Sequence, residues 1–420
     1  MAELLRLVTA GSVDTGKSTL IGRLLFDSRH VYDDQLAAIE AASQRRARGH
    51  LDLSMLTDGL RAEREQGITI DVAYRYFTTP ARKFVLADTP GHVQYTRNMV
   101  TGASLAHVCV LVVDVVDGLT EQTRRHAVIA GLLGVETLIL AINKMDRVGY
   151  SQDAFDTLTN EFTAFADGLG FDRLAFVPIS ALHGENVVRS SSEMPWYGGP
   201  SLLTFLETVP FGPDHDHEPL RLPIQLVIRA GGSQPGRQYT GRIASGTAHV
   251  GDQVAALPSG IVTTIRSLAI GNEPTAESSA GASVSLTISD DLDVSRGSML
   301  VDPARRPVTS RSFTANVTAL GSRSIEVGAE FSLKHTSRWS RCFIRSIDFV
   351  YDLSDLSRHD PAESIHLNDV AQVRIETLDP LFLDPYAVNR TTGSMIIVDR
   401  ATNETVMAGM VVEAEGLAAS

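Results

Sequence analysis

The feature that most constrains this chain is an eight-residue motif near its start, Gly11-Ser12-Val13-Asp14-Thr15-Gly16-Lys17-Ser18. It has the pattern G-x-x-x-x-G-K-[ST], whose glycines let backbone N–H groups turn toward a phosphate. An apolar run over Leu4–Ala10 precedes the motif and predicts a buried strand. An apolar-periodic stretch over Ser18–Phe26 follows it and predicts a helix. A strand, a phosphate loop and a helix in this order predict a nucleotide site.

Each polar side chain at the end of this motif has an expected role. Lys17 would reach the β- and γ-phosphates, where its charge would also support catalysis, and the Ser18 hydroxyl would bind Mg²⁺. Thr19, the next residue, is expected among the nucleotide contacts.

Residues 1–212 alternate strand-like and helix-like segments. Helical patterns such as Gln122–Gly131 and Asp153–Leu169 lie between apolar runs. The predicted buried strands are Leu4–Ala10, Lys83–Ala87, Val108–Val113, Thr137–Ile142 and Phe176–Ile179. This rhythm predicts an α/β domain with a doubly wound, mostly parallel sheet, whose nucleotide loops gather at the carboxyl ends of the strands.

The composition changes at a linker rich in Pro and Gly, Val209–Pro213. Beyond it the strands are short and separated by turns, which predicts a small β-barrel or sandwich over residues 218–304. Pro303–Pro307 indicates a second hinge, and residues 308–416 are again strand-rich around a loop-like stretch, Asp352–Asn368. We therefore expect three domains, over residues 1–212, 218–304 and 308–416.

The net charge and the cysteine content of the chain argue against some classes of function. The net charge of −13 argues against a nucleic-acid partner, because phosphate neutralisation needs clustered Lys and Arg. The two cysteines have no metal spacing, and Cys109 lies in an apolar run that predicts burial. We see neither a signal peptide nor an 18-residue apolar span, so we expect a cytoplasmic protein with no membrane partner.

Asp88-Thr89-Pro90-Gly91 directly follows the predicted strand Lys83–Ala87. An Asp at a strand end, followed by Gly, is where a P-loop protein holds Mg²⁺ and senses the γ-phosphate. Alone the pattern is weak, because turns are rich in Asp and Gly. Downstream of a P-loop it predicts a Mg²⁺ ligand at Asp88 and a nucleotide contact at Gly91.

Asn143-Lys144-Met145-Asp146 closes the strand Thr137–Ile142 and predicts the choice of base. The Asp146 carboxylate would accept two hydrogens from the guanine N1 and N2 edge, which adenine does not offer, so GTP is the expected nucleotide. Asn143 would brace the loop and Lys144 would lie against the base. Ser180-Ala181-Leu182 would supply an N–H to guanine O6. The alternative for Asp146 is a helix N-cap.

Two further residues are expected to act in hydrolysis. Thr69, within Arg64–Ile70, would complete the Mg²⁺ shell only while the γ-phosphate is present, and its alternative is a β-branched strand residue. His92 is placed to orient the attacking water without acting as a formal base, and its alternative is a structural histidine. The other eleven histidines show no ligand spacing, and we expect them on the surface.

Several stretches resemble the GTPase subunit of bacterial sulfate adenylyltransferase: Arg61–Phe77, Gly91–Met99, Met194–Tyr197, Lys334–Thr336 and Asn389–Gly393. The resemblance covers essentially the whole chain. It implies a P-loop GTPase domain followed by two all-β barrels, as in elongation factor Tu, with GTP and Mg²⁺ as cofactors. Gly241–Val254 resembles the strand–turn–strand of the second elongation-factor domain.

The resemblance also implies a function. A smaller partner subunit of the adenine-nucleotide-hydrolase type would make adenosine 5′-phosphosulfate and pyrophosphate from ATP and sulfate. This chain would hydrolyse GTP to drive that uphill step, in a heterodimer or a higher assembly of heterodimers. Thr15, where the family commonly has Asp, and Val93, in place of an acidic residue, depart from the pattern. Some relatives carry an added kinase domain, which we expect this chain to lack.

Two other functions stay open. One is a translation elongation factor-type GTPase that binds aminoacyl-tRNA, and the other is a stand-alone regulatory GTPase. The runs Tyr74–Tyr76 and Gln94–Arg97 favour the sulfate-activating family, and the negative charge suits a tRNA carrier poorly. A stand-alone GTPase would leave the two barrels without a purpose.

Overall fold

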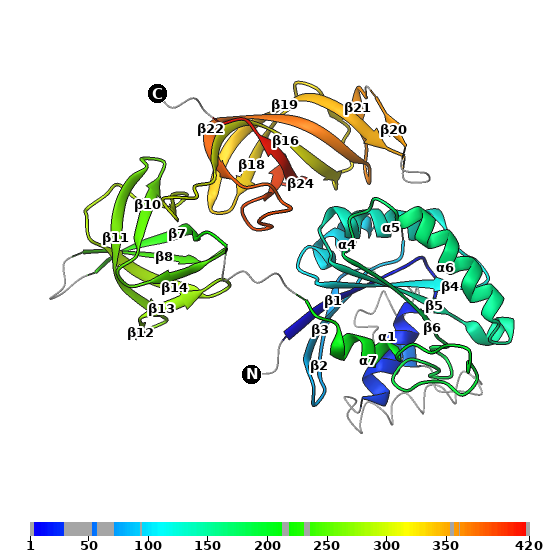
Figure 1. Ribbon diagram of the computed structural model, residues 1–420. Coiled ribbons are helices and arrows are strands. Elements are labelled where there is room, and N and C mark those ends of the chain that lie inside the picture. The colour runs from blue at the N-terminus through cyan, green and yellow to red at the C-terminus, as the bar shows by residue number, and fades with distance from the viewer. Residues whose placement is uncertain are drawn as a thin grey trace. The chain divides into compact units, whose positions relative to one another are not determined.

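The structure is a computed structural model that describes residues 4–28, 53–56, 71–92, 95–211, 218–230, 236–352, 357–360 and 362–416. The chain forms two compact units. One comprises residues 1–211 and 353–357, and the other comprises residues 212–352 and 358–420. Figure 1 colours both units along the chain.

The first unit contains a six-stranded sheet. Its strands are β1 (Leu4–Ala10), β2 (Ala73–Thr78), β3 (Lys83–Asp88), β4 (Val108–Asp114), β5 (Thr137–Asn143) and β6 (Arg173–Pro178). They lie in the order β2-β3-β1-β4-β5-β6, and only β2 runs antiparallel to its neighbour. This arrangement confirms the predicted doubly wound, mostly parallel sheet.

Helices cover both faces of this sheet (Figure 1). They are α1 (Lys17–Asp27), α4 (Thr96–Ala103), α5 (Glu121–Leu132), α6 (Gln152–Ala166) and α7 (Leu202–Thr208), with short 3-10 turns η1 (Leu53–Leu56) and η3 (Met145–Val148). Thr120, Ser151 and Ser201 cap α5, α6 and α7 by accepting a backbone N–H of the first turn. These caps fix where the helices begin.

The centre of the sheet is fully buried. Every residue of β4 and β5 is buried, as expected for parallel strands covered on both faces. Cys109 in β4 is 0% exposed, which confirms its predicted burial. The apolar residues of α1 and α7 pack with those of the sheet in one core cluster.

Element bounds differ from the predictions at the sheet's edge. β6 begins at Arg173 rather than Phe176, because an edge strand with partly exposed residues gives no continuous apolar run. α6 ends at Ala166 rather than Leu169, just before Gly168, whose φ of +86° no helix residue adopts.

The second unit holds two seven-stranded antiparallel sheets. The first consists of β7 (Arg221–Ala230), β8 (Gly236–Arg242), β10 (Gln253–Leu257), β11 (Ile261–Ile270), β12 (Glu273–Thr275), β14 (Ser283–Ile288) and β15 (Met299–Val301), beside a small pair, β9 (Thr247–His249) and β13 (Glu277–Ser279). β10 also pairs with β11, which closes the sheet into a barrel. We refer to it as barrel A.

Barrel B closes in the same way, through the pairing of β18 with β19. Its sheet consists of β16 (Val308–Ala319), β18 (Glu330–His335), β19 (Arg338–Tyr351), β20 (Arg358–His359), β22 (Val370–Leu383), β23 (Ser394–Val398) and β24 (Thr405–Ala414), beside the pair β17 (Ile325–Glu326) and β21 (Ser364–Ile365). The closures confirm the two predicted all-β barrels. Their division into separate domains stays a prediction, because compactness groups them together.

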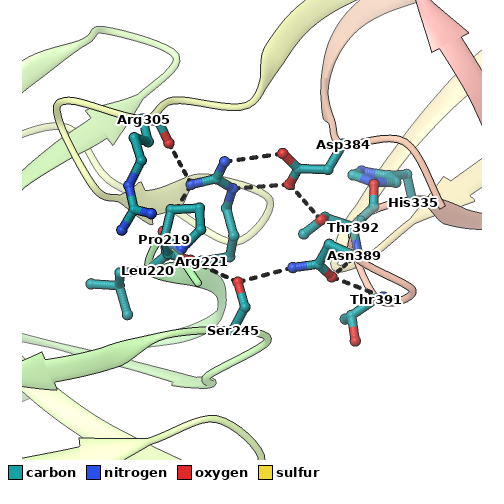
Figure 2. A network of polar contacts seen from close by, with 10 residues as sticks. All are labelled: Pro219, Leu220, Arg221, Ser245, Arg305, His335, Asp384, Asn389, Thr391 and Thr392. Atoms are coloured by element: carbon teal, nitrogen blue, oxygen red, sulfur yellow. Dashed lines mark hydrogen bonds and ion pairs between the residues drawn. The ribbon is translucent and has the colours of Figure 1, made fainter. Parts of the chain in front are cut away.

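A polar network joins the two barrels (Figure 2). Arg221 of barrel A, 3% exposed, donates from Nε and Nη2 to the Asp384 carboxylate of barrel B at 2.9 and 3.0 Å. Thr392 Oγ1 donates to the same carboxylate at 2.6 Å. Asn389 Nδ2 donates to Ser245 Oγ at 2.9 Å, a second bond between the barrels.

One predicted surface histidine lies inside this region. His335 is 1% exposed, and its Nε2 is 2.7 Å from the Thr392 carbonyl oxygen. The surface prediction is wrong here because β18 alternates its side chains, and His335 falls on the buried side of that alternation. Burial lowers the pKa of His335 to about 4.

Candidate nucleotide site

The loop between β1 and α1 is wound too tightly for side chains at its glycines. Gly11 has φ +143° and Gly16 has φ +91°. A Cβ on Gly11 would lie 2.3 Å from the Val112 carbonyl oxygen, and one on Gly16 would lie 2.5 Å from Asn143 Nδ2. Both predicted motif glycines are therefore required by the geometry of the loop.

The side chain of Lys17 folds back across the phosphate loop. Its Nζ donates to the carbonyl oxygens of Gly11 at 2.8 Å and Ser12 at 2.7 Å. Burial lowers the pKa of Lys17 to about 8, and the carboxylates of Asp88 and Asp14 oppose this shift. The Lys17 ammonium is thus held at the centre of the loop, where it could neutralise the charge of a bound phosphate.

Asp88 and Gly91 meet this loop from β3. The Asp88 carboxylate, 1% exposed, accepts a hydrogen bond from Thr9 Oγ1 of β1 at 3.3 Å. A Cβ on Gly91 would lie 2.5 Å from Lys17 Nζ, so this glycine allows the close approach of the two segments. Ser18 and Thr19 lie half-buried in the first turn of α1.

Asn143 ties the predicted base loop to the phosphate loop. Its Nδ2 donates to the Thr15 carbonyl oxygen at 2.8 Å, and its Oδ1 accepts the Ala181 N–H at 2.9 Å. Lys144, in the left-handed region at φ +63°, donates from Nζ to the Asp14 carbonyl oxygen at 2.6 Å. Three motifs far apart in the sequence are thus bonded together.

Asp146 lies in η3, half-buried, and accepts a hydrogen bond from Ser180 Oγ at 2.6 Å. The following helix α6 is capped by Ser151, so the N-cap alternative for Asp146 is not realised there. The carbonyl oxygens of Ala181 and Leu182 accept from the Arg23 guanidinium of α1. The bond between Ser180 and Asp146 joins the two segments that are predicted to read the base.

Asp114 contacts the predicted base loop and was not predicted from the sequence. Its Oδ2 accepts from Lys144 Nζ at 2.8 Å and from Arg147 Nη1 at 3.0 Å. Burial raises the pKa of Asp114, but hydrogen bonds from Lys144 and the Val116 N–H outweigh it, and the pKa lies below its usual range. Its position as the last residue of a buried strand beside the base loop was the available signal.

His126 of α5 is the second missed residue, and the prediction that it lies on the surface is wrong. It is 0% exposed, and its Nδ1 accepts the Gly11 N–H at 3.0 Å. Burial lowers its pKa to about 3, and the charges of Lys17 and Arg125 act in the same direction. The helix α5 turns this residue inward toward β1 and the phosphate loop.

The remaining predicted residues are placed as follows. Val13 is exposed, and Thr15 is buried with its hydroxyl donating to the Ser12 carbonyl oxygen at 2.9 Å, so the departure at Thr15 fits the loop. His92 is exposed, with its ring centroid 6.0 Å from that of Tyr95. Thr69 and Val93 lie outside the described residues.

Comparison with known proteins defines the class first. Residues 2–212 match the family described as the elongation factor Tu GTP binding domain, and residues 312–412 match the GTP-eEF1A C-terminal domain-like family. The first unit is thus a GTP-binding domain of the translation-factor type, on which the phosphate and base loops lie.

The particular family follows from relatives that match 98% or more of this chain. A bifunctional enzyme CysN/CysC of Mycobacterium tuberculosis (strain CDC 1551 / Oshkosh) is 49% identical, with 67% of its length covered. Proteins named sulfate adenylyltransferase subunit 1 are 46% identical in Bacteroides fragilis (strain YCH46) and 44% in Aeromonas hydrophila, with 86% and 87% of their lengths covered. The chain belongs to the sulfate adenylyltransferase subunit 1 family, as its motifs indicated.

Proposed function

We propose that this chain acts as the GTPase subunit of a sulfate adenylyltransferase, driving synthesis of adenosine 5′-phosphosulfate and pyrophosphate from ATP and sulfate. The observation that carries the proposal is membership of the family over 98% of the chain, with the GTP-binding motifs bonded into one cluster. The elongation factor-type alternative shares the same GTP-binding domain, so that match does not favour it.

The phosphate groups of GTP would be held by Gly11–Ser18 and Gly91. Support comes from the two motif glycines, where a Cβ would fill the space around the loop, and from the buried Lys17 ammonium. Backbone N–H groups at the start of α1 add the positive end of the helix dipole. Lys17 would neutralise charge that develops on the β- and γ-phosphates.

The donor set also fits Mg²⁺, which prefers hydroxyl and carboxylate oxygens. Ser18 and Asp88, together with Thr69 from outside the described residues, would hold the ion. A bound Mg²⁺ would offset the negative charge of the phosphates. The Thr9 hydroxyl, which donates to Asp88, would orient its carboxylate toward that place.

Asp146 would select guanine by accepting from its N1 and N2 hydrogens. The Ser180 hydroxyl holds one carboxylate oxygen at 2.6 Å and so limits its rotation. Lys144, anchored by Asp114, would lie against the base. The exposed His92 would orient the attacking water, and Thr69 would report the presence of the γ-phosphate.

Coupling to sulfate activation requires a partner that binds the GTP and GDP states with different affinity. We assign that role to a small catalytic subunit of the adenine-nucleotide-hydrolase type, in a heterodimer or an assembly of heterodimers, with no nucleic-acid or membrane partner. Among the described helices, none has the length and apolar composition to span a bilayer. Both cysteines are unpaired thiols, which agrees with the proposed cytoplasmic location.

The proposal is tested by copurifying the chain with its small subunit and measuring adenosine 5′-phosphosulfate formation. We expect product formation to depend on GTP and to fail with a nonhydrolysable GTP analogue. If GTP made no difference while aminoacyl-tRNA bound tightly to the chain, the elongation factor-type function would replace this one.

A further inference from the structure

We infer that His126 is a positioning residue of the nucleotide site: as the acceptor for the Gly11 N–H, it holds the phosphate loop in its nucleotide-binding conformation. The inference rests on the proposed GTP site and goes beyond it. His126 lies on α5, 115 residues from Gly11 and outside every motif that predicted the site.

Gly11 is held at both ends of the residue. Its N–H donates to His126 Nδ1 at 3.0 Å, and its carbonyl oxygen accepts from Lys17 Nζ at 2.8 Å. The Gly11 Cα faces the Val112 carbonyl so closely that no Cβ fits. In so enclosed a place, removing the imidazole would leave the N–H buried without an acceptor, which destabilises this loop conformation relative to others.

The imidazole must be neutral for this role, since a charged ring has two donors and no acceptor. Its other nitrogen, Nε2, lies 2.8 Å from the Gln122 side-chain amide, one helical turn earlier. With Nδ1 accepting, Nε2 carries the hydrogen. Rotation of the Gln122 amide lets its oxygen accept that hydrogen, in place of its 3.3 Å bond from Arg125 Nη1. The nearby positive charges of Lys17 and Arg125 also disfavour a second proton.

A second contact from the same helix reaches the next loop residue. Thr120, the N-cap of α5, has its Oγ1 2.5 Å from Ser12 Oγ, and it also accepts the Thr123 N–H at 3.1 Å. The start of α5 therefore contacts Gly11 through His126 and Ser12 through Thr120. Movement of this helix would therefore change the phosphate loop at two adjacent residues. Because His126 makes one of these two contacts, it should affect how long a nucleotide stays bound.

The test compares two variants of the full chain by stopped-flow release of a fluorescent GDP analogue. His126→Leu keeps the bulk and removes the acceptor, and His126→Asn places an amide oxygen where Nδ1 stands. We expect His126→Leu to release GDP about tenfold faster, because losing such a buried bond costs about 1.4 kcal/mol. Release from His126→Asn should stay within about threefold of the wild-type rate.

A purely structural histidine would behave differently. If His126 positions the phosphate loop, KM for GTP rises in His126→Leu while kcat changes by less than about twofold. His335→Leu, which removes the buried histidine of the second unit, is the matched control and should leave GDP release unchanged. Equal release from wild type and His126→Leu would overturn the inference, whereas failure of the wild type to bind GDP would overturn the proposed GTP site instead.

A measurement on the wild-type protein covers the case in which His126→Leu does not fold. Hydrogen exchange of the Gly11 amide, without nucleotide, should be slow because His126 accepts its hydrogen. Exchange at the rate of an exposed loop amide would overturn the inference.

Discussion

The phosphate loop of the first unit and the ion pair between the barrels of the second bury polar groups in different ways. Around the phosphate loop, side chains bond to backbone: Lys17, Asn143 and Lys144 all donate to loop carbonyl oxygens. Between the barrels, side chains bond to side chains, as Arg221 does to Asp384. The first arrangement shapes a backbone for a ligand, and the second satisfies its own charges.

This contrast predicts which substitutions should weaken nucleotide binding and which should lower folding stability. Turning loop carbonyls toward side chains lets loop N–H groups other than that of Gly11 face an anion, so changes there should weaken nucleotide binding. A closed ion pair has nothing left to offer a ligand, so breaking it should act on folding alone. The predictions below test this division.

The largest effect is expected from Asp384→Ala. It leaves the Arg221 guanidinium buried without its carboxylate, which should lower the free energy of unfolding of the second unit by about 3–5 kcal/mol. Urea unfolding followed by circular dichroism measures this loss.

The matched control for that variant is Arg345→Ala, which breaks the pair of Arg345 with Glu376 on the surface of barrel B. Both side chains are about half exposed, so the loss should stay below about 1 kcal/mol. Equal losses in the two variants would show that burial of the Arg221 pair does not matter.

A smaller effect, on binding rather than folding, is expected from Gly16→Ala. The new Cβ would meet Asn143 Nδ2 at 2.5 Å in a left-handed backbone, so GTP affinity should fall on the order of a hundredfold. Isothermal titration calorimetry with GTP measures it. Gly168→Ala has a similar φ, +86°, with nothing within 4 Å of the new Cβ, and should bind GTP normally. Normal binding by Gly16→Ala would contradict the role of the loop.

The smallest effect concerns the pH dependence of the stability of the second unit. Burial lowers the pKa of His335 to about 4, below its ordinary 6.5. The unfolded chain therefore binds more protons than the folded one between these values, so stability is present above pH 6.5 and is lost as pH falls toward 4.

Urea unfolding at pH 7 and pH 5 should show the second unit less stable at pH 5, by on the order of 1–2 kcal/mol from His335. His335→Asn should remove that part of the slope. A slope unchanged in the variant would mean that other groups carry the pH dependence.

Residues of a local motif could be predicted from the sequence, whereas residues that contact each other only in the folded chain could not. Gly11 and Lys17 were predictable because a phosphate loop needs fixed residue types at fixed spacing, and Asn143 because it opens a short motif at a strand end. His126 was not, because it acts through the fold on a motif that does not contain it. Asp114 had one signal, its place at the end of a buried strand. Arg221 and Asp384 are 163 residues apart, and no local pattern links them. The strands at the sheet's centre were predicted within a residue, whereas β6 at its edge was not.

Coupling of GTP hydrolysis to sulfate activation can be tested by changing the nucleotide that the subunit prefers. Asp146→Asn replaces a carboxylate, which accepts the guanine hydrogens, with an amide that can donate. An amide donor suits xanthine, which has a carbonyl oxygen where guanine has its amino group. In the complex with the small subunit, we predict that the variant forms adenosine 5′-phosphosulfate with xanthosine triphosphate and poorly with GTP, the reverse of the wild type. Unchanged GTP preference would remove Asp146 from base selection, and product formation that ignores both nucleotides would contradict the coupling itself.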